Sequence, residues 1–284
     1  MIDATAIVVD SAAYLPAAVT ERYGLITVPL TVIVDGQEFR EYVDLDGPTF
    51  YRRLAEGATV STSQPSPGRF IEAYEAAAAA GAQRIVSIHI GSAISGTVNS
   101  ARLASASSPV PVHVIDTGQA SFIEGLCAWE AIEALAAGAT IEEAEAAAHR
   151  AAAAVGNVFI VRGLELLKQG GRMLEAPAPP DSAPPVPVLA LVDGAIRPIG
   201  SPASIDDALE AMVAHVTKAV EANPGKSFRT GISNGAADEL AALLEARVRA
   251  IPQMDEVMQY EIGPVVGAHT GPGCTGAVFL PRPV

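Results

Sequence analysis

The stretch IVSIHIGSAISGTVNSARL, residues 85–103, contains the unit from which this chain is built. It opens with an apolar run typical of a buried strand, passes through small and hydroxyl residues, and closes with the spacing of an amphipathic helix. A strand, a polar turn and a helix in that order form the repeating unit of α/β proteins with parallel strands. The functional question is whether the hydroxyl groups at the join, Ser92, Ser95 and Thr97, attack a substrate or hold a ligand.

The same alternation runs through most of the chain. Short apolar runs predict strands at residues 4–9, 26–34, 84–90, 110–116, 157–161, 186–192, 195–199, 228–232, 257–262 and 276–280. Helical periodicity predicts helices at residues 67–80, 96–106, 119–137, 141–155, 205–222 and 236–250. We therefore expect an α/β fold whose N-terminal sheet is mostly parallel. Asp193-Gly194 between two apolar runs predicts a β-hairpin, which makes the C-terminal sheet mixed.

Two α/β domains are expected, with an approximate boundary that places residues 1–165 in the first and 166–284 in the second, although the chain is free to interleave. Six prolines fall between Pro177 and Pro187, too many for a helix or a central strand. We interpret this segment as a surface loop or interdomain linker, with a partner-docking segment as the alternative.

Composition excludes several classes of function. The chain has 284 residues, 18 basic against 32 acidic, and a net charge of −14, so nucleic acid and anionic membranes are poor partners. Neither a secretory signal nor a membrane-length apolar run is visible, which predicts a soluble cytoplasmic protein. Cys127 and Cys274 are the only cysteines, so neither a disulfide nor a metal site is expected.

Several predicted strands end in turns rich in glycine and hydroxyl groups, where open α/β sheets bind ligands. Ser95 is a good candidate to cap the helix that follows, and Gly96 allows another group to approach the backbone closely. The start of that helix favours an anion because its N–H groups are free and its dipole is positive. Simple capping, with no ligand, explains Ser95 equally well. The loop HTGPG adds a titratable imidazole, His269, to this set.

One motif suggests an enzyme instead. GISNG, residues 231–235, matches the G-x-S-x-G pattern of a nucleophile elbow, and a predicted strand precedes it while a helix follows. Asp255 or Glu256 and then His269 stand downstream in the order that a triad would need. Against a serine esterase centred on Ser233, no HGGG-type oxyanion segment precedes the motif and little chain follows it. The esterase stays as the alternative hypothesis.

Four motifs together resemble the DegV family: TSQPSPGRF, SAISGTVNSAR, GLELLKQGGRM and GAHTGPGCTG. They occur in the family's order and rough spacing, and the resemblance covers nearly the whole chain. DegV proteins are bacterial fatty-acid-binding proteins. The resemblance implies two α/β domains with a ligand tunnel between them, a buried palmitate-like fatty acid, and no catalytic residue, metal or further cofactor. It also implies a monomer.

By the same resemblance, Thr62 of TSQPS and Ser95 of SGT hold the ligand carboxylate, with His269 of HTGPG beside it. Further ligand contacts are implied in these loops, at Ser63, Ser92, Gly96, Thr97, Thr270 and Gly271. Some members present the bound acid to a separate ATP-dependent fatty acid kinase. Arg172 of the GGR loop is then expected to face that partner.

The chain departs from the family at several points. Val98-Asn99 replaces the usual Tyr-Gln after SGT, and Tyr14 stands where an Asp is common. Residues 200–212, GSPASIDDALEAM, lack the basic residues that face the kinase in relatives, so a lipid carrier with another recipient is an alternative. A binder of a different carboxylate or of an acyl conjugate is a further alternative.

Overall fold

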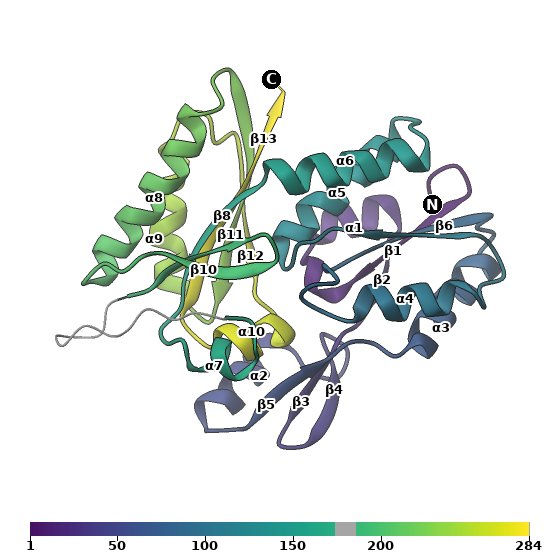
Figure 1. Cartoon of the computed structure of the whole chain (residues 1–284), viewed down its shortest axis with the longest axis horizontal. Coiled ribbons are helices and arrows are strands. Elements are labelled where there is room, and N and C mark those ends of the chain that lie inside the picture. Colours follow the sequence, from purple (N-terminus) through teal and green to yellow (C-terminus); the bar gives the residue numbers. More distant parts are fainter. Residues whose placement is uncertain (174–185, 284) are drawn as a thin grey trace. The chain divides into compact units, whose positions relative to one another are not determined.

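The computed structural model of the chain describes residues 1–173 and 186–283. It divides into two compact units (Figure 1): the first comprises Met1–Leu45 and Thr62–Ala153, and the second comprises Asp46–Ser61 and Ala154–Val284. The chain thus enters the second unit at Ala154, before the boundary placed at residue 165, and it also lends residues 46–61 to that unit. The predicted proline-rich loop or linker lies almost wholly outside the described residues.

The first unit contains a four-stranded sheet that is parallel throughout, in the order β2-β1-β6-β7. Its strands are β1 (Thr5–Asp10), β2 (Ile26–Val28), β6 (Arg84–His89) and β7 (Val112–Asp116). Every residue of β1 is buried, as expected for a parallel strand covered on both faces. The parallel pairing predicted for the N-terminal sheet is confirmed.

Helices cover both faces of this sheet (Figure 1). They are η1 (Ser11–Ala13), a 3-10 turn, followed by α1 (Ala17–Tyr23), α3 (Pro67–Ala79), α4 (Thr97–Ser105), α5 (Phe122–Ala136) and α6 (Ile141–Ala154). The core on the α3–α4 side includes Phe70, Tyr74 and Ala101, packed against Val8 and Ile85 of the sheet. This layered arrangement leaves the loops at the ends of the strands as the part of the unit available for a ligand.

The strand order gives one edge of this sheet special importance. The chain proceeds from β1 outward to β2 on one side, and later to β6 and β7 on the other. The connections therefore diverge at the carboxyl ends of β1 and β6, which is the place where open α/β sheets form ligand sites. Asp10 ends β1 and His89 ends β6, and the SGT loop follows His89 directly.

A small three-stranded sheet has the order β4-β3-β5. β3 (Thr31–Val34) and β4 (Gln37–Arg40) form an antiparallel hairpin, with Asp35 and Gly36 at positive φ in its turn. The sequence had predicted one long strand over residues 26–34; the structure contains β2, a break at Pro29, and β3 instead. β5 (Val60–Ser63) carries the chain into the TSQPS loop.

The second unit has a mixed six-stranded sheet in the order β10-β9-β8-β13-β11-β12. Its strands are β8 (Gly156–Ile160), β9 (Val188–Val192), β10 (Ala195–Gly200), β11 (Lys226–Gly235), β12 (Glu256–Glu261) and β13 (Cys274–Pro283). β9 and β10 form the predicted hairpin, with Asp193 at φ 51° and Gly194 at φ 74°, the left-handed pair that a type I′ turn needs.

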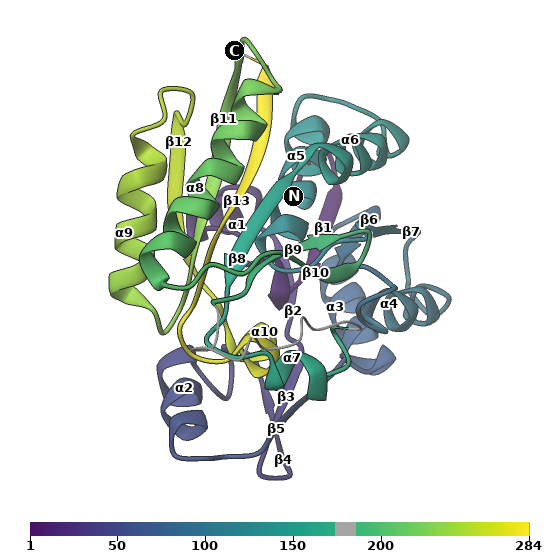
Figure 2. The ribbon, with the colours of Figure 1, turned by 60° about the vertical axis from the view of Figure 1, so that its left-hand side comes forward.

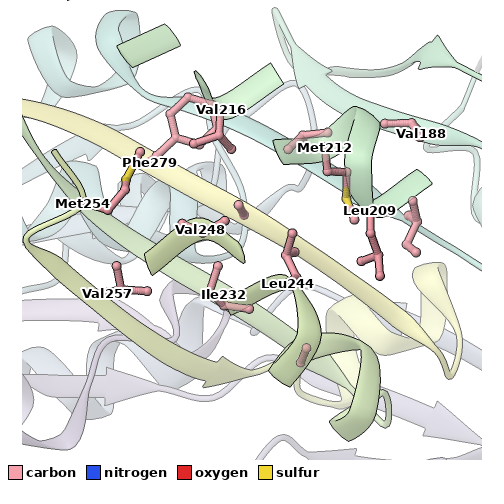
Figure 3. Packing of buried hydrophobic residues seen from close by; sticks show 14 of the residues in the cluster. Val188, Leu209, Met212, Val216, Ile232, Leu244, Val248, Met254, Val257 and Phe279 are labelled. Atoms are coloured by element: carbon pink, nitrogen blue, oxygen red, sulfur yellow. The ribbon is translucent and has the colours of Figure 1, made fainter. Parts of the chain in front are cut away.

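Two long helices, α8 (Ile205–Glu221) and α9 (Asp238–Arg249), pack on one face of this sheet (Figure 1). Figure 3 shows side chains of α8 and α9 meeting the strand residues Ile232 and Phe279. Those helix residues include Leu209, Met212, Val216, Leu244 and Val248. This core explains the helical periodicity seen in the C-terminal half of the sequence.

Sequence patterns missed the short helices. They are α1, α2 (Gly47–Ala55), α7 (Glu165–Gln169) and α10 (Pro264–Thr270). The HTGPG segment was expected to be a loop, but His269 lies in the last turn of α10. This helix begins with a proline in its first turn and ends before Gly271, which has a φ of 72°. The many glycines of the segment made it look like a loop in the sequence. Across the described residues, no helix combines the length and apolarity needed to cross a bilayer.

Candidate ligand-binding site

The SGT loop is a compact turn between β6 and α4. The N–H groups of Ile94 and Ser95 both donate to the Gly91 carbonyl, at 2.9 and 3.0 Å. α4 begins one residue later than expected, because its N-cap is Gly96 and not Ser95. The Ser95 hydroxyl instead lies 2.8 Å from Oγ1 of Thr97 and accepts the Thr97 N–H at 3.4 Å. Ser95 therefore sits half-buried at the start of the helix, with a second hydroxyl beside it.

The neighbouring strand end braces this loop. The Gly91 N–H donates to the Gln119 carbonyl at 2.7 Å, and a Cβ at Gly91 would approach the Gly118 backbone to 2.5 Å. Asp116 accepts the N–H groups of Ser92 and Gly118. Partial burial works to raise the pKa of Asp116, but hydrogen bonds from Ser92 and Gly118 hold this pKa below its ordinary value. The backbone of Ser92 thus has a structural role, while its side chain is exposed.

The TSQPS loop meets the SGT loop within the first unit. A Cβ built on Gly96 would lie 3.0 Å from Cδ of Gln64 and 3.1 Å from its Nε2, so the Gln64 side chain covers Gly96. Thr62 is half-buried, and the Ser63 hydroxyl donates to the Gln64 carbonyl at 3.3 Å. Ser66 stands at the N-cap of α3 with Pro67 after it, although the Ser66 side chain makes no capping hydrogen bond. Gln64 was not singled out from the sequence, and only its contact with Gly96 reveals it.

This cluster can bind an anion without a formal positive charge. Ser95 and Thr97 present hydroxyl groups at the N-terminus of a nine-residue helix, where backbone N–H groups and the helix dipole favour negative charge. Hydroxyl and amide donors can satisfy a carboxylate that has been removed from water. The hydroxyl of Ser95 contacts Thr97 and not a side chain that could act as a base, so the arrangement suits holding a ligand better than attacking one.

The second unit contains its own pair of predicted residues. α7 and α10 lie side by side (Figure 2), and the GGR loop follows α7. A Cβ on Gly170 would collide with Nδ1 of His269, so the imidazole packs on the backbone of that loop. Burial, reinforced by the nearby Arg172 guanidinium, lowers the pKa of His269 to about 4. The ring is neutral at physiological pH and acts as a hydrogen-bonding group, not as a cation.

The other predicted residues of the second unit have structural partners. The Arg172 guanidinium donates to the Gly170 carbonyl at 2.7 Å, and the Thr270 hydroxyl donates to the Val266 carbonyl at 3.2 Å. The Gly271 N–H closes α10 through the Gly267 carbonyl at 2.8 Å. The GGR and HTGPG motifs are therefore brought together by α7 and α10, as TSQPS and SGT are in the first unit.

The esterase interpretation of GISNG is wrong. Ser233 lies within β11, paired with Tyr260 on one side and Gly276 on the other, and not in a strand-to-helix elbow. Its side chain is buried, and its hydroxyl donates to the Gly276 carbonyl at 3.4 Å. Glu256, one of the proposed triad acids, pairs with Arg229 and Arg282 instead. The motif did not predict a nucleophile elbow correctly because strand β11 continues through all five residues of GISNG.

The described residues contain no group of three histidine, cysteine or acidic side chains able to hold a metal ion. Cys127 and Cys274 are free, buried thiols, and burial raises the pKa of Cys274 to about 12. They are inert at neutral pH because the thiolate is the reactive form.

Comparison with known proteins agrees with this fold. A model of the DegV family matches residues 4–282. A DegV domain-containing protein of Streptomyces coelicolor is 37% identical over 279 residues, covering 98% of each chain. Among solved structures, a DegV family protein from Thermus thermophilus described as binding fatty acid has a TM-score of 0.87 at 30% identity, covering 98% of this chain and 99% of its own. A stearic acid-binding protein from Eubacterium ventriosum has a TM-score of 0.87 at 25% identity, covering 97% of both chains.

The fold and its loops define a class: a two-unit α/β protein with hydroxyl-rich loops gathered at the carboxyl edge of a parallel sheet. The chain belongs to the DegV family.

Proposed function

We propose that this protein binds a long-chain fatty acid, buries the acyl chain, and holds the carboxylate through Thr62 and Ser95 without catalysing a reaction. The observation that carries the proposal is the contact of the TSQPS and SGT loops at Gly96 and Gln64, at the point where the parallel sheet diverges. Related structures at 25% and 30% identity are described as fatty-acid-binding, which supports the same ligand class.

The physical chemistry of such a site is favourable. A carboxylate desolvated in the protein needs several donors, which Thr62, Ser95 and the N-terminal amides of α4 can supply. Affinity comes mainly from the tail, because each buried CH₂ contributes about 0.8 kcal/mol. A chain of about 16 carbons offers about 12 kcal/mol before the costs of immobilisation are subtracted. The two hydroxyl groups therefore set orientation and select a carboxylate over a neutral head group.

For His269 we propose the role of a neutral hydrogen-bond donor to a ligand carboxylate. A neutral imidazole offers one N–H, and its low pKa means that it does so without adding charge. Ser63, Ser92, Gly96, Thr97, Thr270 and Gly271 are proposed as parts of the loops that shape the head-group region. Ser63, Ser92, Thr97 and Thr270 make hydrogen bonds within the protein, which suits support of the loops.

The carrier role extends the proposal to a recipient of the bound acid. A separate fatty acid kinase is one candidate, and Arg172 would then face it. Residues 201–207 argue for a partner that does not require basic residues there, because Asp206 and Asp207 stand at the start of α8 and Asp206 pairs with Arg247. Phosphorylation of the bound acid by a purified fatty acid kinase, with Arg172→Ala as the comparison, tests this extension.

Native mass spectrometry of protein purified without added lipid tests the core proposal. We expect one fatty acid per chain, identified after organic extraction, and its loss from a Thr62→Ala/Ser95→Ala double variant. Ser66→Ala is the matched control, because Ser66 is an exposed hydroxyl in the same loop whose side chain makes no capping hydrogen bond. A wild-type protein that arrives empty and takes up no fatty acid from solution would refute the proposal.

A further inference from the structure

Three carboxyl groups are buried together in the first unit, near the carboxyl end of β1. Asp10 and Glu41 are each 1% exposed, and Glu124 at the start of α5 is 0% exposed. Burying an ionised carboxylate is costly unless it is paired or well hydrogen-bonded. Each of the three carboxyl groups therefore needs hydrogen-bond donors or must stay neutral, and their contacts show which of them have donors.

Asp10 makes hydrogen bonds through both of its carboxyl oxygens. Its Oδ1 accepts the Ala12 N–H at 3.0 Å, and its Oδ2 accepts the Ile90 N–H at 3.0 Å. Nδ1 of His89 lies 3.1 Å from the same Oδ2. Asp10 thus ties the turn after β1 to the last residues of β6.

The hydrogen-bonded chain continues beyond His89. Nε2 of His89 lies 2.6 Å from the Ser87 hydroxyl, which lies 2.9 Å from the Tyr74 hydroxyl. Ser87, His89 and Asp10 have the order of a hydrolytic triad, but all three are buried and Tyr74 occupies the far side of Ser87. These buried side chains therefore form a hydrogen-bonded chain that ends at Asp10 and offers no nucleophile to a substrate.

Glu41 is also supplied with donors. The Ser11 hydroxyl donates to Oε2 of Glu41 at 2.5 Å, and the Tyr14 hydroxyl donates to Oε1 at 3.3 Å. Both carboxyl oxygens of Glu41 therefore receive a hydroxyl donor.

Glu124 differs from both. Within the described part of the chain, neither of its carboxyl oxygens meets a hydrogen-bond donor. The titratable groups that face it are Asp10 and Glu41, with the buried Cys127 thiol one helical turn away on α5. Burial comes first, followed by the charge of Asp10, a hydrogen bond with Asp10 and the charge of Glu41, and together these raise the pKa of Glu124 well above its ordinary value.

We propose that Glu124 is a neutral carboxylic acid whose O–H donates to Asp10, and that this bond positions the strand-end loops on which the ligand carboxylate is held. A protonated Glu124 has a donor of its own, which explains how a side chain that receives no donor can be buried beside two carboxylates. The second half of the proposal rests on the fatty-acid-binding function proposed above.

The connection from Glu124 to Ser95 is short. Asp10 holds the N–H of Ile90, the next residue is Gly91, and the Gly91 carbonyl accepts the N–H of Ser95 at 3.0 Å. On the other side, α5 is tightly seated, because a Cβ on Gly125 would overlap the Ala13 carbonyl of η1. An ionised Glu124 would repel Asp10 at the residue that joins these loops, so ionisation is expected to loosen the site.

Infrared difference spectroscopy of the whole protein tests the protonation state directly. We expect a carbonyl band of a buried, protonated carboxylic acid at neutral pH, lost in Glu124→Gln and retained in Glu75→Gln. Glu75 is an exposed glutamate on α3 and serves as the matched control. Absence of the band from wild type, or its persistence in Glu124→Gln, would overturn the assignment whether or not the protein binds fatty acid.

Palmitate affinity measured from about pH 6 to about pH 10 tests the positioning role. We expect the wild-type affinity to fall at alkaline pH, where Glu124 ionises. The fall should be about tenfold for each pKa unit by which the pKa of Glu124 is higher in the ligand-bound protein than in the free protein. Glu124→Gln, which keeps the shape and a donor, should preserve affinity and flatten this profile, whereas Glu124→Leu should weaken binding at every pH.

The possible results separate the two proposals. Equal palmitate affinities for wild type, Glu124→Gln and Glu124→Leu would overturn the positioning role while leaving fatty-acid binding intact. If wild type binds no palmitate, the proposed function fails, and the infrared band alone then decides the state of Glu124.

Discussion

At the scale of single residues, the space around two glycines shows which segments pack closely together. Gly96 has an ordinary helical φ of −73°, so its backbone would accept a side chain. What limits it is the Gln64 side chain, which would lie 3.0 Å from a Cβ at Gly96 and is exposed and able to move. Gly125 is limited by backbone instead, because the Ala13 carbonyl lies where its Cβ would be.

These two glycines should respond differently to alanine. Gly125→Ala is expected to destabilise the protein by about 3 kcal/mol, because neither α5 nor η1 can give way without repacking. Urea denaturation measures the change. Gly68→Ala on α3 is the control, since its Cβ would make only an ordinary 3.6 Å contact with Ser66, and we expect a stabilisation of about 0.5 kcal/mol. Similar effects at both positions would contradict the tight seating of α5.

Gly96 and Gln64 should be energetically coupled in ligand binding. Gly96→Ala is expected to weaken fatty-acid binding by displacing Gln64, and the loss should be smaller when Gln64→Ala is already present. A double-variant cycle on the binding free energy should therefore give a coupling of about 0.5 kcal/mol or more. Strictly additive effects would show that the TSQPS and SGT loops act independently.

His269 gives a pH dependence of known sign. The pKa of His269 in the folded protein is lowered from 6.5 to about 4. Between these two pH values the unfolded chain binds a proton at His269 and the folded chain does not. Stability should therefore fall as the pH drops from about 6.5 to about 4, by at most about 3 kcal/mol. Denaturation of wild type and His269→Gln across this range measures the difference, and parallel curves would contradict the low pKa.

At the scale of secondary-structure elements, α5 is defined by what its first turn buries. On this helix, Glu124 is buried beside Asp10 and Glu41, which belong to other segments of the first unit. Phe122, Leu126 and Ala128 of the same helix are buried hydrophobic residues. A helix that buries an acid must keep it neutral or pair it. We expect the cost of burying Glu124 to appear as a dependence of stability on pH.

Glu124→Gln should remove that dependence. Between the ordinary glutamate pKa and the raised value in the fold, the folded state keeps a proton that the unfolded chain has released. The free energy of unfolding of wild type should thus fall as pH rises through this window, while the variant is unaffected by this group. Denaturation at about pH 5 and about pH 9 should show the variant gaining on wild type at the higher pH.

At the scale of the whole molecule, ligand binding should appear as stability. A ligand that binds only the folded protein raises the free energy of unfolding by about 2.7 kcal/mol when its free concentration is one hundred times Kd. Palmitate should therefore raise the melting temperature of wild type and of Ser66→Ala, but not of Thr62→Ala/Ser95→Ala. Equal shifts in all three would show that the carboxylate is held elsewhere.

Much of the fold was accessible from sequence. Apolar runs and helical spacing identified the strands of the parallel sheet and the long helices α8 and α9, because one buried face imposes a period on the chain. Asp193-Gly194 predicted the hairpin, since few other residues tolerate two positive φ angles. The resemblance to DegV proteins placed the candidate residues in four loops, and the family comparison confirmed that membership.

Other features depended on tertiary structure. A five-residue pattern could not show that Ser233 lies inside a central strand, because the pairing of β11 with β12 and β13 joins distant segments. The short helix that carries His269 was hidden by glycines, and residues 46–61 joined the second unit only through packing.

The sequence by itself determined most of the strands, the long helices and the loops that carry donors, because those properties follow from local periodicity and composition. Only the tertiary structure decided that Gln64 covers Gly96 and that Glu124 is buried against Asp10 and Glu41. A carboxyl group becomes a neutral acid through the charges and the loss of water around it, and these are supplied by residues far away in the chain.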